Sequence, residues 1–267
     1  MPSPIAVKTI IRKEWAELYK NTLVLGTVVF LPLFLAALPL LILWASGDIM
    51  GGTAEAVGSE LPPQMGDLCR GLSSGECGQL LIVSQFTLFF MMIPLFIPAT
   101  IAPYSIVGEK TQRSLEPLLA TPISTVELLL GKNLAAVIPA VLATWFAYAF
   151  FAIGARLLVA SPQVFSRLFG PDDLLQVLVI GPLLAVFSVD LAIMISSRSN
   201  DARVAQQISS LVVLPIVFLF IGQLAGILVF NTLLTYILLL AAFFIDIILT
   251  YLSVHVFDRE TILTRWS

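Results

Sequence analysis

Six long apolar runs divide this sequence and constrain its fold more than any other feature. A membrane-spanning helix needs about 20 mainly apolar residues to cross roughly 30 Å of hydrocarbon, and the runs match that length. With 58% hydrophobic and 12% charged residues, the chain lies outside the range of soluble domains. We therefore expect an all-α integral membrane protein with a single transmembrane domain over residues 1–267. The expected spans are residues 23–45, 80–107, 133–157, 176–197, 204–222 and 233–257.

The positions of Lys and Arg predict the orientation of these spans, because cytoplasmic segments carry an excess of both residues. With the N-terminus inside, all but three of the 14 basic residues fall on the cytoplasmic side. The exceptions are Arg70, Arg156 and Arg167. We therefore expect a multi-pass protein of the cell membrane, with both termini and the segments 108–122 and 198–203 in the cytoplasm.

Residues 5–20 are expected to form an amphipathic helix at the inner membrane interface. Val7, Ile11, Trp15 and Leu18 recur at helical spacing, and the basic residues lie mostly elsewhere around the helix. Tryptophan suits the headgroup region, and cations suit an anionic lipid surface. A soluble helix packed on the protein's own loops is the alternative.

The polar segment 46–79 is expected to be an extracytoplasmic loop. It is rich in glycine and acidic residues, and it holds both cysteines, Cys69 and Cys77. An oxidising exterior makes these two a disulfide candidate, with two free thiols as the alternative. The loop also matches the G-x-S-x-G pattern of serine hydrolases over residues 71–75. The single histidine, His255, would lie across the membrane from it, which argues against that chemistry.

Prolines and acids inside the apolar runs mark a candidate transport pathway. Pro94, Pro98 and Pro103 predict a kinked helix with unpaired carbonyls, which either lines a pathway or is a packing feature. Asp190 and Asp246 lie within expected hydrocarbon, where an acid costs about 2.5 to 3.5 kcal/mol and is a functional candidate by default. The alternative for each acid is a protonated carboxyl that hydrogen-bonds a neighbouring helix.

The segment 108–122 is a polar interruption between the second and third apolar runs. Leu115, Leu118 and Leu119 fall on one helical face, and Pro122 disfavours helix at the residue before it. We therefore expect a short helix at the membrane surface, followed by a corner.

Ser124 and Glu127 match a capping box that restarts the helix before the third run. This arrangement of helix, corner and helix suits a docking site for a cytoplasmic protein, although a helix lying on the lipid would have the same pattern.

Three motifs resemble the type-2 ABC transporter permeases. The first cytoplasmic loop matches at Glu109, residues 114–119, residues 121–124, Glu127 and residues 131–132. The second loop matches at residues 202–203 and 205–207, and the C-terminal tail is similar over residues 257–266. The resemblance implies a coupling helix over residues 109–119 that sits in a groove of an ATP-binding subunit. The docking residues that it implies are Glu109, Arg113, Leu115, Glu116, Leu118, Leu119, Thr121, Pro122 and Arg203.

The resemblance implies the permease subunit of an ATP-driven exporter. The sequence has no G-x-x-x-x-G-K-[ST] phosphate-binding loop, so we expect no catalytic residue, metal or cofactor in this chain. ATP and Mg²⁺ would bind a separate ATP-binding subunit, present in two copies. Further expected partners are a second copy of the permease or a related permease, and membrane lipid, but no nucleic acid. An ion-coupled secondary transporter with its ion site at Asp246 is the alternative.

Overall fold

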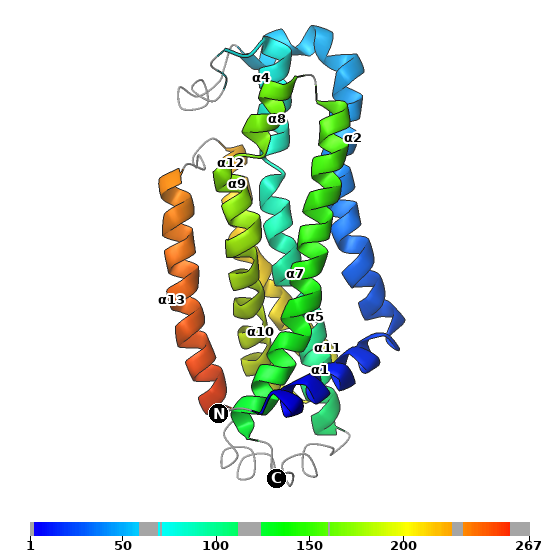
Figure 1. Cartoon of the computed structure of the whole chain (residues 1–267), viewed down its shortest axis with the longest axis vertical. Helices are drawn as coiled ribbons and strands as arrows, with labels where there is room; N and C mark the ends of the chain where they lie inside the picture. Colours follow the sequence, from blue (N-terminus) through cyan, green and yellow to red (C-terminus); the bar gives the residue numbers. More distant parts are fainter. Residues whose placement is uncertain are drawn as a thin grey trace.

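The computed structural model describes residues 3–58, 69, 71–111, 124–159, 161–225 and 232–256, and all regular elements in these ranges are helical. In chain order the elements are α1 (Pro4–Leu18), α2 (Thr22–Gly58), α4 (Ser74–Ser84), α5 (Thr87–Thr111), α7 (Thr125–Leu158), α8 (Pro162–Leu168), α9 (Pro171–Leu175), η1 (Gln176–Ile180), α10 (Gly181–Arg198), α11 (Ala202–Ser210), η2 (Leu211–Val213), α12 (Leu214–Leu224) and α13 (Thr232–Val256). Figure 1 shows that they form an elongated bundle.

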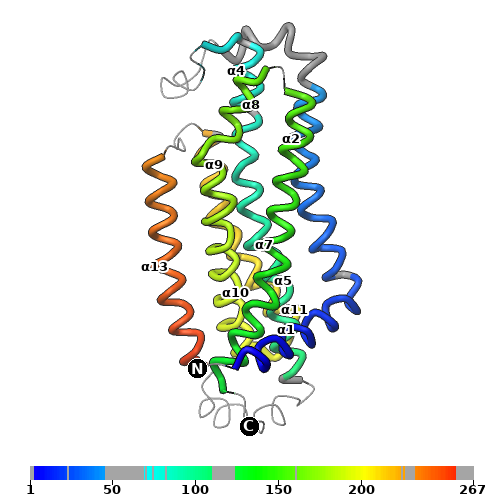
Figure 2. The backbone as a smooth tube through the Cα atoms, in the orientation of Figure 1, coloured from blue at the N-terminus to red at the C-terminus, as the bar shows by residue number. Residues whose placement is uncertain are grey.

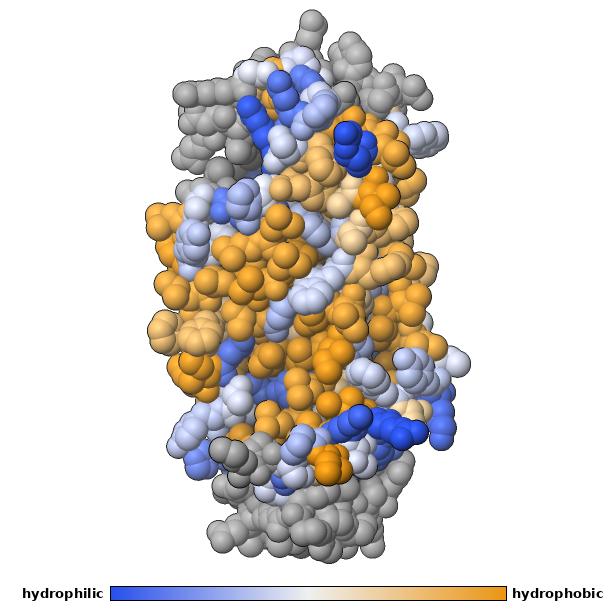
Figure 3. Space-filling view, in the orientation of Figure 1, coloured by the Kyte–Doolittle hydropathy of each residue, from blue (hydrophilic) through white to orange (hydrophobic). Residues whose placement is uncertain are grey.

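Six helical segments in the described part of the chain are long and apolar enough to cross a membrane, which confirms the predicted number. In the fourth segment the short elements α8, α9 and η1 lead into α10, and in the fifth α11 leads through η2 into α12. Figure 3 shows a broad apolar belt between two more polar ends. The segments are Val24–Ala45, Thr87–Glu109, Thr125–Leu158, Pro162–Arg198, Ala202–Gln223 and Thr232–Val256.

α5 lies at the centre of the bundle and α13 at its edge. Within the most apolar part of each helix, 78% of the residues are buried in α5 but only 11% in α13. α5 packs against α2, α7, α10 and α11, and its side chains Phe90, Ile93 and Ile97 are fully buried. α13 packs mainly against α10, and both backbone views show it on the outside of the bundle (Figures 1 and 2).

α1 crosses one end of the bundle, where α5 ends and α7 begins (Figure 2). We call this the α1 end. The helix starts at Ser3, whose hydroxyl accepts a hydrogen bond from the Ala6 amide at 3.3 Å, and Pro4 follows at a position that suits proline. Its buried face packs on α7, and its opposite face is exposed. The predicted N-terminal helix is therefore present, and one of its faces binds the protein itself.

The segment 46–79, predicted to be an extracytoplasmic loop, has helical structure at both of its ends. α2 continues to Gly58, and α4 begins at Ser74. No proline interrupts residues 46–61, and an established helix extends through glycines at a cost of only about 1 kcal/mol each. At the other end, Ser73 and Glu76 form a capping box that starts α4.

The opposite end of the bundle from α1 carries a disulfide. Cys69 and Cys77 are bonded to each other, as the sequence predicted. Gly71 lies between them with a φ of 78°, a conformation that glycine adopts without steric cost. Ser73 serves as the cap of α4, and α4 lies far from the last turn of α13, which holds His255 (Figure 1). The G-x-S-x-G pattern over residues 71–75 therefore has a structural role.

α5 runs as one helix through Pro94, Pro98 and Pro103. All three prolines are buried, so neighbouring elements surround the carbonyls that lose their usual donors. The Ser188 hydroxyl of α10 donates to the Leu95 carbonyl at 2.5 Å, so a hydrogen bond joins α10 to α5 between Pro94 and Pro98.

Candidate functional site

Most of the predicted docking residues lie outside the described residues, but both ends of the segment that holds them are visible. The docking residues outside the described ranges are Arg113, Leu115, Glu116, Leu118, Leu119, Thr121 and Pro122. The segment leaves from the end of α5 and returns at the start of α7, both at the α1 end. Arg203 is exposed in the first turn of α11, where its amide donates to the capping carboxylate of Asp201 at 2.7 Å.

A buried cluster of charged groups lies directly behind this segment. The Lys132 ammonium of α7 is 2.9 Å from Glu14 Oε1 of α1 and 2.8 Å from Glu109 Oε2 of α5, and it donates to the Ser105 hydroxyl at 2.6 Å. Lys13 of α1 donates to Glu109 Oε1 and lies 3.5 Å from Glu14 Oε1. We call these five residues the ion network. It joins three helices that lie far apart in the sequence.

Because the ion network is buried, the loss of any one of its buried charges should destabilise the fold. The side chains of Lys132, Glu14 and Glu109 are 4%, 6% and 8% exposed, whereas that of Lys13 is 41% exposed. Removing one partner from a buried pair leaves an uncompensated charge, which costs about 3 to 5 kcal/mol. Glu109, which the resemblance implied for docking, is therefore an internal partner of two lysines and is not available to a docking surface.

Two members of the network, Glu14 and Lys13, have pKa values shifted in the direction that keeps them charged at neutral pH. Burial alone would raise the pKa of Glu14, but the Lys132 ammonium and hydrogen bonds from Ser105 and Lys132 outweigh it and lower that pKa. Burial would likewise lower the pKa of Lys13, but Glu109 and the other nearby carboxylates outweigh it and raise that pKa. A lowered carboxyl pKa stabilises the fold above the unfolded value of about 4.5, and this contribution disappears as the pH falls through the folded value. The contribution of Glu14 is therefore lost in acid, and that of Lys13, whose pKa is raised, is lost only in strong alkali.

The start of α1 is fixed to the first turns of α7 by two further contacts. The predicted capping box is confirmed: Glu127 accepts from the Ser124 amide and hydroxyl at 2.8 Å each. Its other oxygen accepts from the Ser3 amide at 2.5 Å. One turn later, a Cβ at Gly131 would lie 2.7 Å from the Ile10 side chain. Glycine at that position therefore permits the two helices to approach closely.

The end of α1 is fixed to α7 by a hydrogen bond that a proline makes necessary. Pro139 has no amide hydrogen, so the Ala135 carbonyl one turn earlier lacks its usual helical donor. The Trp15 indole N–H donates to that carbonyl at 3.0 Å. Because an unpaired carbonyl is costly within the apolar belt, this bond both satisfies α7 and holds α1 in place.

These contacts make α1, the end of α5 and the start of α7 one mechanical unit. Residues 112–123 connect two helices that Lys132 and Glu109 bind to each other. α1 lies against α7 from Ser3 to Trp15 and adds Lys13 and Glu14 to the same network. A force applied to the connecting segment would therefore move all three helices together.

Asp190 lies in a second polar cluster between α7, α10 and α13. It is 1% exposed and accepts three hydrogen bonds, from Asn133 Nδ2 at 3.1 Å, Thr250 Oγ1 at 2.6 Å and Ser253 Oγ at 3.2 Å. The hydrogen bonds to neighbouring helices that the alternative for this acid requires are therefore present. Since Asn133 follows Lys132, this cluster adjoins the ion network along α7.

Asp246 differs from Asp190 because its carboxyl group has no hydrogen bond to any residue that the structure describes. It is 6% exposed, and within the described residues neither of its oxygens has a partner. It lies one turn before Thr250 on α13, and a negative charge on it would be repelled by a negative charge on Asp190. A buried polar group without a partner is rare, so Asp246 remains a candidate for a function that the bundle alone does not explain.

The residues predicted to line a pathway do not converge on one site. α5, α10, α12 and α13 border an apolar groove of about 280 Å³, lined by Leu95, Phe187, Ile216 and Ile245 among others. Pro94, Pro98 and the two aspartates are not among its lining residues. The groove and the polar cluster are therefore separate features of the same helices.

Sequence reasoning missed the ion network, although two signals for it were present. Glu14 is a charged residue on the otherwise apolar face of α1, between Ile10 and Leu18. Lys132 is a lone charge at the start of an apolar run, where we took it for part of a cytoplasmic loop. A charge in an apolar setting requires a partner of opposite sign, and these two residues are partners of each other.

The fold defines a multi-pass, all-α membrane protein, with a charged and tightly joined unit at one end. Residues 8–257 match the family described as ABC-2 family transporter protein, and the chain belongs to that family. It is therefore the membrane permease component of an ABC transporter, a class in which the permease works with an ATP-binding subunit. This match confirms the resemblance seen in the sequence. No curated protein matches the chain.

Proposed function

We propose that the chain is the permease subunit of an ATP-driven exporter and that a separate ATP-binding subunit docks on residues 112–122 and Arg203. The observation that supports docking is the ion network behind this segment, in which Lys132 contacts both Glu14 and Glu109. A docking segment transmits force only if its two ends are held together. The network supplies that connection from buried groups that water does not screen.

Closure of the ATP-binding subunit around ATP would push the docking segment. Because α1, α5 and α7 are joined, the push would displace these helices as one body instead of bending the segment. α5 packs on α10 at the centre of the bundle, so its displacement would reach the helices that border the 280 Å³ groove. ATP and Mg²⁺ would bind the partner, and this chain would supply the coupled movement.

The charges on the bundle support a cytoplasmic location for the α1 end. Lys8, Arg12, Lys20, Arg198 and Arg203 are exposed near this end. The disulfide lies at the other end, where an oxidising exterior would preserve it. An even number of spans then puts both termini in the cytoplasm of a protein of the cell membrane.

The assembly that we propose contains two permeases and two ATP-binding subunits. The exposed apolar side chains of α13 would face lipid or the second permease, which is either another copy or a related chain. A second candidate function, cation coupling at Asp246, rests on a single observation, which is the absence of a hydrogen-bond partner for that carboxyl group among the described residues.

Copurification tests the proposed docking. The tagged chain is purified from its native membranes in mild detergent, and the proteins that accompany it are identified by mass spectrometry. We expect a subunit with a phosphate-binding loop to accompany the wild type and to be lost from the Leu118→Arg, Leu119→Arg double variant. Leu157→Arg, at an exposed position near the opposite end of α7, is the matched control and should retain the subunit. Equal recovery with the double variant would contradict docking at this segment.

A further inference from the structure

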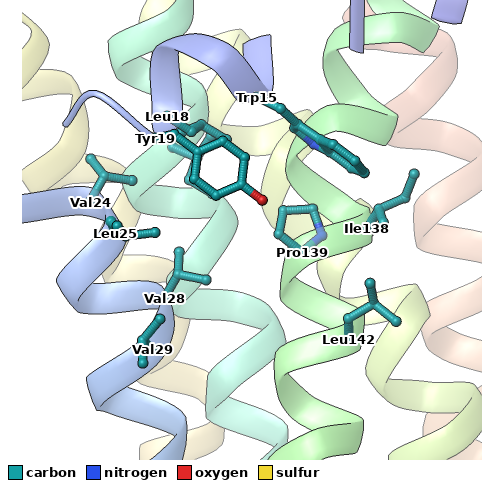
Figure 4. Close-up of a pocket in the computed structure, with 11 residues that line it drawn as sticks. Trp15, Leu18, Tyr19, Val24, Leu25, Val28, Val29, Ile138, Pro139 and Leu142 are labelled. Atoms are coloured by element: carbon teal, nitrogen blue, oxygen red, sulfur yellow. The ribbon is translucent and has the colours of Figure 1, made fainter. Parts of the chain in front are cut away.

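An apolar groove lies between α1, α2 and α7. It has a volume of about 330 Å³, and its walls include Trp15 and Tyr19 of α1, Val28 and Val29 of α2, and Leu142 of α7. In Figure 4 the Tyr19 ring lies across the groove with its hydroxyl directed toward α7. The indole N–H of Trp15 is already used by the Ala135 carbonyl, so the groove presents an almost entirely apolar lining.

The position of the groove exposes it to the membrane. Val29 and Leu142 belong to the first and third spans, and they are 54% and 56% exposed. Water would not fill an apolar groove of this kind, because it offers almost no hydrogen bonds. The groove also begins beneath α1, whose Trp15 and Tyr19 suit the level of the lipid headgroups. The chemistry that fits it is a hydrocarbon chain entering from the adjoining leaflet.

A pair of cations lies on the same face of α1 as two residues that line the groove. Lys8, Arg12, Trp15 and Tyr19 follow one another along α1 at spacings of four, three and four residues, which puts them on one helical face. Both cations are exposed. The acids of α1 lie on other faces, where Glu14 is bound to Lys132. The face that borders the groove is therefore positive, and it matches an anionic headgroup.

We propose that this groove binds one anionic glycerophospholipid from the leaflet at the α1 end. An acyl chain lies between Val29 and Leu142, and the headgroup phosphate lies beside Lys8 and Arg12. The apolar groove alone accepts any lipid chain, and the cations add a preference for negative charge. The bound lipid fills the seam between α1 and the spans, so that it stabilises the position in which α1 contacts the ion network.

Native mass spectrometry of the purified chain tests this proposal. Phosphatidylglycerol and phosphatidylcholine with identical acyl chains are added separately to the wild type and to two variants. The Lys8→Gln, Arg12→Gln variant removes the cations from an exposed face, and Val29→Trp fills the groove. Matched controls are Arg156→Gln with Arg167→Gln, near the other end of the bundle, and Ile237→Trp, which is exposed on α13.

We expect the wild type and both controls to bind phosphatidylglycerol about tenfold more tightly than phosphatidylcholine. Neutralising Lys8 and Arg12 should bring the two affinities together, and Val29→Trp should weaken the binding of both lipids. Equal binding of the two lipids by the wild type would overturn the proposal. A preference that survives the loss of both cations, or tight binding that survives Val29→Trp, would overturn it as well.

Discussion

Lys132 is the side chain on which the α1 end depends most, because it is itself buried and contacts both buried carboxylates and the Ser105 hydroxyl. Lys132→Met would leave Glu14 and Glu109 buried with less compensation. We predict a loss of about 3 to 5 kcal/mol in the free energy of unfolding, measured by denaturant titration in detergent. Lys13→Met is the matched control. Its side chain is 41% exposed, and its loss should cost clearly less.

The ion pair between Lys132 and Glu14 also predicts the stability of the Lys132→Met, Glu14→Gln double variant. Glu14→Gln removes one of the carboxylates that lose the Lys132 ammonium in Lys132→Met, so the combined loss of stability should be smaller than the sum of the two single losses. Additive losses would show that the two groups do not interact in the folded protein. They would contradict the ion pair that the structure places between α1 and α7.

Asp246 and Asp190 predict opposite responses to the same substitution. Asp190→Leu would remove the shared acceptor of Asn133, Thr250 and Ser253, of which Ser253 keeps the Thr250 carbonyl, and should lower the melting temperature of the purified chain. Asp246→Leu breaks no hydrogen bond among the described residues, and it removes a buried polar group, so the melting temperature should stay the same or rise.

If Asp246 acts in transport, Asp246→Leu should nevertheless reduce the ATPase activity of the assembled complex or its dependence on transported substrate. Normal activity together with normal or raised stability would reduce Asp246 to a packing residue. A large loss of stability would instead mean that its carboxyl group has a structural partner.

The contact between α1 and α7 pairs a proline in one helix with a tryptophan in the other. Trp15→Phe removes the donor to the Ala135 carbonyl and should cost about 1 to 3 kcal/mol of stability. Pro139→Ala restores a backbone donor to the same carbonyl. In the Pro139→Ala background, we therefore expect Trp15→Phe to cost much less. An unchanged cost, measured by denaturant titration, would mean that Trp15 stabilises the protein only by packing.

Sequence periodicity predicted the helices well where one physical requirement dominated. The length of hydrocarbon to be crossed fixed the six spans, and the capping box at Ser124 located the start of α7. The polar composition of residues 46–79 did not predict the helices at its two ends, because polarity does not end a helix in water. The start of α4 was recorded in the capping box at Ser73 and Glu76, but we considered that serine only as a catalytic residue.

The relation between helices was not predictable in the same way. The ion network needs α1, α5 and α7 to cross at one place, and a periodic pattern describes only one helix at a time. Glu14 and Lys132 are separated by more than a hundred residues, so neither sequence spacing nor motif joins them. The hydrogen bond from Trp15 to the carbonyl that Pro139 leaves without a donor could not be predicted for the same reason. The sequence did indicate Cys69 and Cys77 as a candidate disulfide, because these two residues lie close together in it.

In the proposed function, the whole bundle is moved from one end. Its central helix, α5, ends at the segment proposed for docking, and the ion network joins that end to α7 and to α1. We propose that these three helices move together when the ATP-binding subunit acts.

A distance measurement by electron paramagnetic resonance tests this claim most directly. Spin labels are placed on Thr9→Cys of α1 and Val126→Cys of α7, both exposed positions, while the native cysteines stay bonded to each other. In the complex with its ATP-binding subunit, we predict one narrow distance that is the same without nucleotide and with a trapped ATP analogue. Lys132→Met should broaden it. A distance that changes with nucleotide in the wild type would contradict the claim, because α1 would then move independently of α7.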